Sequence, residues 1–521
     1  MITDDTASAF HVSLVGSNDL TRRLAAIAKH RNNYGDLVTI NVSTAIPGEA
    51  RSLIFAERPE ILVVDIGHRT TRRDLTWLHG FLDQVRDRFQ KNIYIILAVT
   101  TPEKFVFAGS LLFREETSLS ASSLIDGLII SPPPGIPSVF SLEDQFRDSL
   151  AYAVGEMTRR REGKLALPSL TDDNWVPVMA DPESRNVWMR WLPRYALYVN
   201  ENPIIVGPTG SGKTRLAAAI HTLSGREGPF IGITPRDFSS TELVQAELFG
   251  AVAGAYTGAV EKWGLVKRAE KGTLFIDELQ SIDRDLQGKL ITFIENKTYR
   301  RVGEADSHEA DVRFIFATNR SLQDLVSDGS LRDDFAYRLE RLQISLTPLH
   351  SRRLDISAGI CYALAKVLRE RYRAKLSYNP NANITELSPL EGLTPSAYRA
   401  LFSSSWPGNL RQLENTVAKL IELADMRHLR LIDTECTGSA LDNLLGKTSV
   451  SAADVFERAA IDVALTVNAE GYNSLSDCLF GLADSARTVA LELSGGDADK
   501  AATLINDSAV AMRLFQASRT A

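Results

Sequence analysis

A phosphate-binding loop is the feature that most constrains how this chain folds. Residues 207–214 read Gly-Pro-Thr-Gly-Ser-Gly-Lys-Thr, after the apolar run 204–206 and before the helix-forming run 215–220. Two glycines alone are typical of many turns, but the Lys-Thr pair and the strand-to-helix context favour a nucleotide site. In such loops backbone N–H groups surround phosphate oxygens, the lysine attracts the β- and γ-phosphates, and the last hydroxyl binds Mg²⁺. The expected nucleotide contacts are Gly207, Pro208, Thr209, Gly210, Ser211, Gly212, Lys213 and Thr214.

Polar side chains follow two later apolar strands. The run 272–276 ends in Asp277 and Glu278, and the run 312–317 ends in Thr318 and Asn319. Asp277 can support the Mg²⁺ that Thr214 also binds, and Glu278 can polarise the water that attacks the γ-phosphate. The Asn319 amide is placed to sense that phosphate. The pattern therefore predicts nucleotide hydrolysis as well as binding.

Composition sets the broad class of the protein. A chain of 521 residues with 44% hydrophobic and 24% charged residues is typical of soluble protein with about three domains. The three cysteines are widely separated and show no metal spacing. We expect a cytoplasmic protein without membrane contact, because neither a leader nor a membrane-spanning run stands out. With a net charge of −7, any DNA contact needs a local basic surface.

The first 160 residues alternate apolar runs with segments long enough for helices. This alternation predicts a parallel sheet wrapped by helices, that is, a doubly wound α/β fold. The apolar runs are His11–Gly16, Leu37–Val42, Ile61–Ile66, Asn92–Thr100 and Asp126–Ile130.

The layout of this segment resembles a response-regulator receiver domain. Asp65 and Thr100-Thr101 stand at the strand ends where receivers carry the phosphorylated Asp and a hydroxyl. However, Asn18-Asp19 replaces the acidic pair that holds Mg²⁺ in receivers, and Ser131-Pro132 stands where receivers have a Lys. Without these partners phosphoryl transfer loses its electrostatic support. We expect a receiver-like sensor that is not phosphorylated; alternatively, Asp65 simply ends a strand.

Between the phosphate loop and the carboxylate pair lies a segment that resembles the sigma-54-dependent transcription activators, also called bacterial enhancer-binding proteins. Their AAA+ ATPase domain carries a Gly-Ala-Phe-Thr-Gly-Ala loop, and here residues 247–259 read Glu-Leu-Phe-Gly-Ala-Val-Ala-Gly-Ala-Tyr-Thr-Gly-Ala. Two glycines make a flexible loop, and the aromatic and hydroxyl side chains suit contact with a partner. The alternative is a helix connection with a buried tyrosine. The resemblance implies that sigma-54 contacts Gly254, Ala255, Tyr256, Thr257, Gly258 and Ala259.

The resemblance continues over about 220 residues and implies further roles. Gly303 lies in an Arg-Val-Gly segment, and residues 331–339 resemble the helix that reaches the ATP of a neighbouring subunit. Arg338 is the expected arginine finger and Arg332 its companion, unless both form only surface ion pairs. Arg411, in Trp-Pro-Gly-Asn-Leu-Arg, matches the second sensor motif and should touch the nucleotide. A site completed by a neighbour implies a closed homo-oligomeric ring. The resemblance implies that this ring is a hexamer or heptamer.

Two departures from the family pattern bear on mechanism. Tyr256 stands in place of the loop Phe, which keeps an aromatic face and adds a hydroxyl. Thr234 stands where the family has an Asn that restrains the catalytic Glu. The restraint on Glu278 is therefore an open question at the level of sequence.

The rest of the chain supplies linkers and a helical C-terminal segment. The Arg159–Arg161 run is expected to be a solvated face, with DNA contact as the alternative. Residues 454–458, 474–480 and 496–505 together are faintly similar to the C-terminal helix-turn-helix of the RNA-repair operon activator RtcR, a member of the same family. The run around Asn506 also matches a Fis-type helix-turn-helix. The expected basic contacts are few, which keeps a helical packing or dimerisation module open: Arg487, Lys500, Arg513 and Arg519.

The expected architecture is a multi-domain α/β protein. A receiver-like sensor spans 1–160, a linker 161–178, an AAA+ α/β ATPase subdomain 179–345, its helical lid 346–437, a linker 438–452 and a helical DNA-binding domain 453–521. The main functional hypothesis is an ATP- and Mg²⁺-dependent activator that binds upstream promoter DNA and remodels the sigma-54 RNA polymerase complex. The alternatives are a non-transcriptional AAA+ remodelling ATPase and a nucleotide-binding scaffold without turnover.

Overall fold

The structure is a computed structural model that describes residues 8–16, 18–29, 38–45, 47–67, 70–113, 124–133, 141–162, 180–378 and 384–445. The chain divides into two compact units, Met1–Pro132 with Phe140–Leu441, and Pro133–Val139 with Asp442–Ala521. The helix-turn-helix expected at 453–521 lies outside the described residues. In the described part, no helix is long and apolar enough to cross a membrane.

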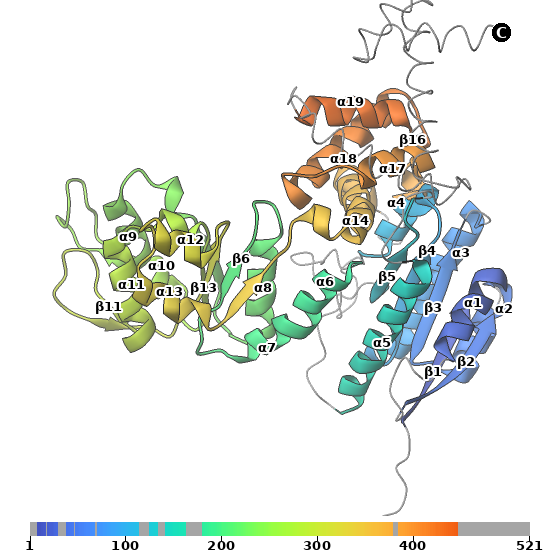
Figure 1. Cartoon of the computed structure of the whole chain (residues 1–521), viewed down its shortest axis with the longest axis horizontal. Helices are drawn as coiled ribbons and strands as arrows, with labels where there is room; N and C mark the ends of the chain where they lie inside the picture. Colours follow the sequence, from blue (N-terminus) through green and yellow to red (C-terminus); the bar gives the residue numbers. More distant parts are fainter. Residues whose placement is uncertain are drawn as a thin grey trace, which may run out of the picture. The chain divides into compact units, whose positions relative to one another are not determined.

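A five-stranded parallel sheet forms the N-terminal part, in the order β2-β1-β3-β4-β5 (Figure 1). The doubly wound sheet predicted from the alternating apolar runs is confirmed. All six residues of β4, an interior strand, are buried, because helices cover both faces of a parallel sheet. The strands are β1 Ser8–Val15, β2 Val38–Ala45, β3 Ile61–Ile66, β4 Tyr94–Val99 and β5 Gly127–Ile130.

Helices alternate with these strands and begin at clear capping residues. Thr71 and Ser141 each form a capping box with the aspartate three residues later, which satisfies the free N–H groups of the first helical turn. Residues of α1 and α5 share one apolar core with the sheet. The helices are α1 Asn18–Ala28, α2 Pro47–Glu57, α3 Arg72–Phe89, α4 Phe105–Ser110 and α5 Leu142–Arg161.

The arginine run at the end of α5 is not the uniformly solvated face that we expected. The side chain of Arg160 is only 10% exposed and lies 3.0 Å from the Glu156 carboxylate, which is 1% exposed. Arg159 contacts the same carboxylate at 2.9 Å, and Arg161 pairs with Glu60. The difference arises because a buried glutamate one turn earlier requires cationic partners.

A second parallel sheet follows, in the order β14-β6-β13-β10-β7. Its central strands alternate between two cores: Phe275 and Ile315 pack against α7 and α8, whereas Leu274 and Phe314 pack against α11 and α13. The strands are β6 Ile204–Val206, β7 Phe230–Ile233, β10 Thr273–Ile276, β13 Arg313–Thr318 and β14 Gln343–Ser345. The helices are α6 Pro182–Arg185, α7 Leu192–Leu197, α8 Lys213–Leu223, α9 Thr241–Phe249, α10 Leu265–Arg268, α11 Arg284–Asn296, α12 Leu322–Ser327 and α13 Asp333–Glu340.

Two short hairpins extend this α/β part. Strand β8 Gly250–Ala251 pairs with β9 Lys262–Trp263, and β11 Thr298–Tyr299 pairs with β12 His308–Glu309. A bridge between Ala251 and Val302 joins the two hairpins. The loop expected to contact sigma-54 is therefore the connection of the β8–β9 hairpin.

Helices make up most of the segment that follows β14. A short parallel pair, β15 Gly392–Leu393 with β16 Leu431–Ile432, ties the helices together. The helices are α14 Leu354–Arg371, α15 Arg373–Tyr378, α16 Ile384–Leu387, α17 Pro395–Phe402, α18 Asn409–Met426 and α19 Thr434–Leu445. The linker expected at 438–452 thus begins inside α19.

The N-terminal part packs against this helical segment through α4, which contacts α14. All six residues of α4 are buried. The closest approach is at Gly109, where a Cβ atom would lie 1.9 Å from the carbonyl oxygen of Cys361 on α14. Only glycine fits between these two backbones, so α4 and α14 lie in direct backbone contact.

Aromatic and hydrogen-bonding contacts surround this helix pair. Phe113 stacks on Tyr362 with ring centroids 5.3 Å apart, and Phe105 meets Tyr398 edge-on at 4.9 Å. The Tyr398 hydroxyl donates a hydrogen bond of 3.1 Å to the carbonyl of Ser131. Ser131, at the position where we expected the lysine of a receiver, therefore serves as a hydrogen-bond acceptor for the helical segment.

Candidate nucleotide site and partner loop

The phosphate loop joins β6 to α8 and needs its glycines for backbone reasons. Gly210 and Gly212 adopt φ angles of 76° and 108°, in the left-handed region that side-chain-bearing residues avoid. A Cβ atom on Gly210 would also lie 2.3 Å from the carbonyl oxygen of Gly408. Helix α8 begins at Lys213, so its N-terminal N–H groups point to the place expected for phosphate.

Lys213 lies at the base of the cavity. Its Nζ donates hydrogen bonds to the carbonyls of Gly207 (2.9 Å) and Pro208 (3.2 Å). Burial lowers the pKa of Lys213, and the negative charges of Asp277 and Glu278 oppose that shift. A desolvated ammonium beside two carboxylates is well placed to attract an anionic phosphate.

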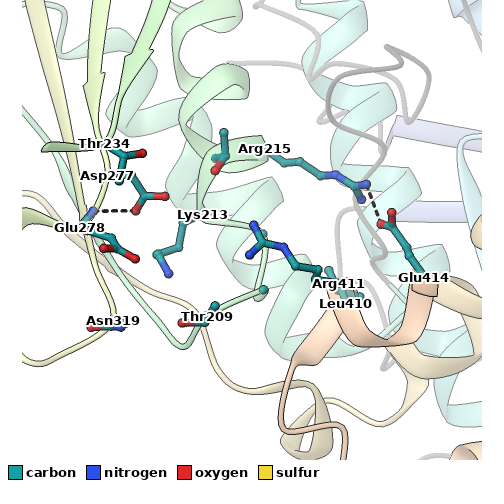
Figure 2. A pocket seen from close by; sticks show the side chains of 13 residues that line it. Thr209, Lys213, Arg215, Thr234, Asp277, Glu278, Asn319, Leu410, Arg411 and Glu414 are labelled. Atoms are coloured by element: carbon teal, nitrogen blue, oxygen red, sulfur yellow. Dashed lines mark hydrogen bonds and ion pairs between the residues drawn. The ribbon is translucent and has the colours of Figure 1, made fainter. Parts of the chain in front are cut away.

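The two carboxylates stand at the end of β10, as their spacing predicted. Asp277 lies beside Ile233 of β7, whose carbonyl accepts its N–H at 3.0 Å, and Asp277 Oδ1 accepts the N–H of Glu278 at 2.9 Å. Glu278 adopts the left-handed conformation, φ 54° and ψ 55°. Figure 2 shows both carboxylates and Lys213 at one cavity. Asn319, from the end of β13, lines the same space.

One cavity collects most of the predicted nucleotide contacts. Gly207, Pro208 and Ser211 belong to the loop but do not line the cavity. Sequence reasoning missed three lining residues, Arg215, Leu410 and Glu414. The predicted residues that line it are Thr209, Gly210, Gly212, Lys213, Thr214, Asp277, Glu278, Asn319 and Arg411.

Glu414 connects the lid to the first helix after the loop. It accepts hydrogen bonds from Arg215 at 2.7 Å and Lys366 at 3.1 Å, and Figure 2 shows the first of these. Its position three residues after Arg411 places both side chains on one face of α18. That spacing is the signal that identifies Glu414 as a site residue.

The start of α18 is fastened to the phosphate loop by backbone and amide contacts. The N–H of Leu410 donates to Gly210 O at 3.0 Å. Asn409, which is 1% exposed, donates to Thr209 O at 2.9 Å and accepts the N–H of Leu349 at 2.7 Å. Any movement of α18 therefore acts directly on the loop.

A buried network fastens the start of α14 to the same loop. Arg352 donates to Ser211 O at 2.9 Å and to the Asp355 carboxylate at 3.2 Å. Asp355 also accepts hydrogen bonds from the Ser184 hydroxyl and from the N–H of Asp181, at 2.9 Å for the latter. Burial raises the pKa of Asp355 to about 7, against the lowering effect of Arg352. Sequence reasoning did not predict this network.

The two predicted finger arginines do not line the cavity of their own chain. Arg332 pairs with Asp334 at 2.7 Å and is 37% exposed, and Arg338 pairs with Glu295 and is 41% exposed. Between them in sequence, Tyr337 is 76% exposed. Surface pairs of this kind break at little cost, so both guanidinium groups are accessible to another molecule.

The predicted partner loop connects β8 and β9. Gly254 and Gly258 have φ angles of 80° and 84°, and the N–H of Ala259 closes a turn on Tyr256 O at 2.9 Å. Thr257 is exposed and Tyr256 is half-buried. A Cβ atom on Gly303 would lie 2.7 Å from the Cβ of Ala255, so the second hairpin supports the loop.

Trp263, at the base of the loop, is a feature that sequence reasoning missed. Arg301 lies over its ring at 4.4 Å, His308 meets it edge-on at 5.1 Å, and the ring remains 48% exposed. Arg301 also donates to Glu304 at 2.7 Å and Glu261 at 3.1 Å. The cation and aromatic ring join the two hairpins into one rigid base.

The receiver-like features are only partly brought together. Asp65 and Thr100 lie at neighbouring strand ends, where the Thr100 hydroxyl donates to Ile66 O at 3.1 Å. Asp19 is 89% exposed and lies 3.7 Å from Arg23. The one acidic residue of the Asn18-Asp19 segment is therefore engaged with an arginine on its own helix.

The phosphate loop follows β6, and the carboxylate pair ends β10, which β13 separates from β6 in the same sheet. Together with a helical lid that carries an arginine, they define a P-loop ATPase domain of the AAA+ class. Comparison with known families agrees with this assignment. Residues 189–345 match the family model of the Sigma-54 interaction domain, and residues 377–436 match that of the AAA+ ATPase lid domain.

Curated relatives match the same part of the chain. The alginate biosynthesis transcriptional regulatory protein AlgB of Pseudomonas aeruginosa is 38% identical over 254 residues, which are 47% of this chain and 53% of AlgB. The regulatory protein AtoC of Escherichia coli is 36% identical over 220 residues, 42% of this chain and 44% of AtoC. The match thus spans about half the length of these relatives.

A solved structure also aligns with the chain. The crystal structure of NtrX from Brucella abortus in complex with ADP covers 99% of this chain and 100% of that chain, with 20% identity and a TM-score of 0.43.

Proposed function

We propose that this protein is an ATP-hydrolysing, sigma-54-dependent transcriptional activator that remodels the sigma-54 RNA polymerase promoter complex. The observation that carries the proposal is the presence, in one Sigma-54 interaction domain, of the carboxylate-lined phosphate cavity and the glycine-hinged loop 254–259. ATP hydrolysis in the cavity supplies the free energy, and the loop presents a surface for contact with sigma-54.

In the proposed reaction each cavity residue has a distinct task. Lys213 and the N–H groups at the start of α8 bind the β- and γ-phosphates of ATP. Thr214 and Asp277, whose oxygens line the cavity, would hold Mg²⁺, which neutralises charge on the phosphates. Glu278 orients the attacking water and accepts its proton, and Asn319 senses the γ-phosphate. Arg411 reports the nucleotide state to the lid.

The path from cavity to loop is short. Thr234 lines the cavity directly after β7, and η5 Pro235–Asp237 and α9 lead from it to Gly250, the first residue of β8. Asp277 is joined to the same strand end through the carbonyl of Ile233. A shift at the carboxylates on phosphate release therefore reaches the base of the partner loop through one continuous segment.

We further propose the assembly and partners that complete this function. Arg338, with Arg332, acts on the ATP of a neighbouring subunit in a homo-oligomeric ring of six or seven copies, and both guanidinium groups are accessible for this. The C-terminal segment 453–521 binds upstream promoter DNA. The N-terminal sheet serves as a receiver-like sensor.

Capture of sigma-54 tests the proposal directly. Full-length protein trapped with ADP and a metal fluoride should retain purified sigma-54, and Thr257→Ala should lose this capture while its ATPase rate stays at the wild-type value. Thr292→Ala removes another exposed hydroxyl, on α11 and bonded only to the helix backbone, and should capture normally. ATPase activity without capture by wild-type protein would instead support a non-transcriptional remodelling ATPase.

A further inference from the structure

The carboxylate of Glu278 has an incompletely satisfied environment. Its side chain is 29% exposed, yet Oε2 is buried and makes no hydrogen bond with any described residue. A buried carboxylate oxygen without a hydrogen-bond donor is costly unless a counter-charge lies nearby. The question is which cation supplies that charge.

Arg236 is that cation. Its Nη1 lies 3.6 Å from Glu278 Oε2, the one ion pair of Glu278 within the part of the chain that the structure describes. At 3.6 Å the contact is electrostatic and not a hydrogen bond. The side chain of Arg236 is 76% exposed, so its charged end can leave the carboxylate without unpacking any core.

The backbones that carry the two residues are fixed relative to each other. Arg236 lies in η5, directly after β7, and Glu278 directly after β10; Ile233 and Ile276 are register partners in the sheet. Pro235 is buried, which anchors the turn that presents Arg236. Thr234 lies one step closer to the strand, but its hydroxyl makes no hydrogen bond to Glu278 among the described residues. The Arg236–Glu278 ion pair is therefore the side-chain contact between the residues that follow β7 and Glu278 at the end of β10.

The ion pair opposes the task proposed for Glu278. A carboxylate that accepts a proton from the attacking water must face that water, whereas the guanidinium of Arg236 engages one of its oxygens. The oxygen that faces Arg236 is also covered, so water does not reach it while the pair is formed. Release of Arg236 leaves the carboxylate free to turn towards the attacking water.

We propose that Arg236 is a positioning residue that restrains Glu278, so that ATP hydrolysis is slow until the Arg236–Glu278 pair breaks. This inference rests on the proposed ATPase function. It assigns the control of turnover to the turn that also leads, through α9, to the partner loop. Engagement of that loop and release of the pair are thereby parts of one movement.

Steady-state ATPase measurements on the full-length chain test the inference. Arg236→Ala should raise kcat about two- to fivefold, the range that corresponds to an exposed ion pair, with KM for ATP unchanged. Arg236→Lys keeps the charge and should stay near the wild-type rate. Added salt should raise the wild-type kcat towards that of Arg236→Ala and leave the variant unaffected, because screening weakens only an existing pair.

Matched controls separate this effect from general changes. Arg341 is 73% exposed and lies 2.8 Å from the Glu201 carboxylate. Neither residue lines the cavity, so Arg341→Ala should leave kcat unchanged. An unchanged or lower kcat in Arg236→Ala overturns the inference alone. Absence of ATPase activity in the wild type, or a rate that Glu278→Gln does not reduce, overturns both the inference and the ATPase proposal. Failure of sigma-54 capture leaves the inference standing.

Discussion

Asp355 shows how one buried side chain links the lid to the phosphate loop at a cost. It is fully buried, it accepts hydrogen bonds from two elements, and its partner Arg352 donates to the loop carbonyl of Ser211. Burial raises its pKa from the ordinary value of 3.8 to about 7. The charged form is therefore held in the folded protein against its desolvation penalty.

The raised pKa predicts a pH dependence of stability. The folded carboxyl binds its proton more tightly than the unfolded one, so this group's contribution to stability falls as the pH rises from about 4 to about 7. In Asp355→Asn, which resembles the neutral form, the decrease in melting temperature between about pH 5 and about pH 7.5 should be smaller than in the wild type.

Asp328→Asn provides the control for that measurement. Hydrogen bonds from Ser330, together with Arg320, lower the pKa of Asp328 to about 2, so it titrates outside this pH window and its variant should keep the wild-type slope. Parallel slopes in wild type and Asp355→Asn would contradict the predicted role of burial.

Among single residues, the sequence predicted those whose positions follow from local geometry. Lys213 and Thr214 follow β6 within eight residues, and Asp277 and Glu278 end β10 of the same parallel sheet, so their positions at strand ends suffice to bring them to one edge. Arg352 and Arg236 were not predicted as site residues. Their contacts depend on how α14 meets the phosphate loop and on the side-chain direction in η5, which spacing does not encode.

Among the elements, α4 is the one whose packing carries the clearest consequence. Its six residues are all buried, and Gly109 lets its backbone approach the carbonyl of Cys361 on α14. A larger residue would separate α4 from α14 and disturb the ring contacts on both sides, including the Phe113–Tyr362 stack. The α4–α14 pair thus helps to hold the N-terminal sheet on the lid, together with contacts such as the Tyr398–Ser131 hydrogen bond.

Substitution of Gly109 tests this contact. Gly109→Val should lower stability by about 1–3 kcal/mol, the usual cost of overpacking, with a lower melting temperature in calorimetry. Gly155→Ala, in the middle of α5 with no atom within 4 Å of the added Cβ, should raise stability by about 0.5–1 kcal/mol. A Gly109→Val protein as stable as the wild type would show that α4 and α14 separate in solution.

The apolar alternation of the first 160 residues correctly predicted the parallel sheet, because period and run length are local properties. It did not indicate that α4 packs on α14. A short apolar helix has the same sequence pattern whether it packs on its own sheet or on a helix of another segment. The arginine run of α5 was interpreted as a solvated face for the same reason. Glu156, its buried partner, is revealed only by tertiary packing.

For the whole molecule, the position of Arg338 outside its own cavity predicts that activity is shared between subunits. Glu278→Gln and Arg338→Ala proteins should each be nearly inactive alone. An equimolar mixture should recover about a quarter of wild-type ATPase activity, because about one site in four combines an intact Glu278 with a neighbour that donates Arg338. The ATPase activity of the mixture is measured in a steady-state assay.

The double variant Glu278→Gln with Arg338→Ala, mixed with Arg338→Ala, is the control and should recover nothing. A mixture of the single variants that stays inactive would contradict action in trans, and full activity of Arg338→Ala alone would remove Arg338 from the site. Arg332→Ala is expected to behave like Arg338→Ala with a smaller loss, because Arg332 is the companion residue.

The fit between Gly109 and Cys361 also restricts how such a protein can arise by gene fusion. An ATPase segment with this α14 requires an N-terminal domain whose fourth helix is short and apolar. That helix must also carry a glycine where it meets the backbone of α14. A foreign input domain joined at the same boundary would leave the apolar side of α14 exposed to water. The two segments are therefore expected to be inherited together, and chimaeras should succeed only with donors that bring a matching helix.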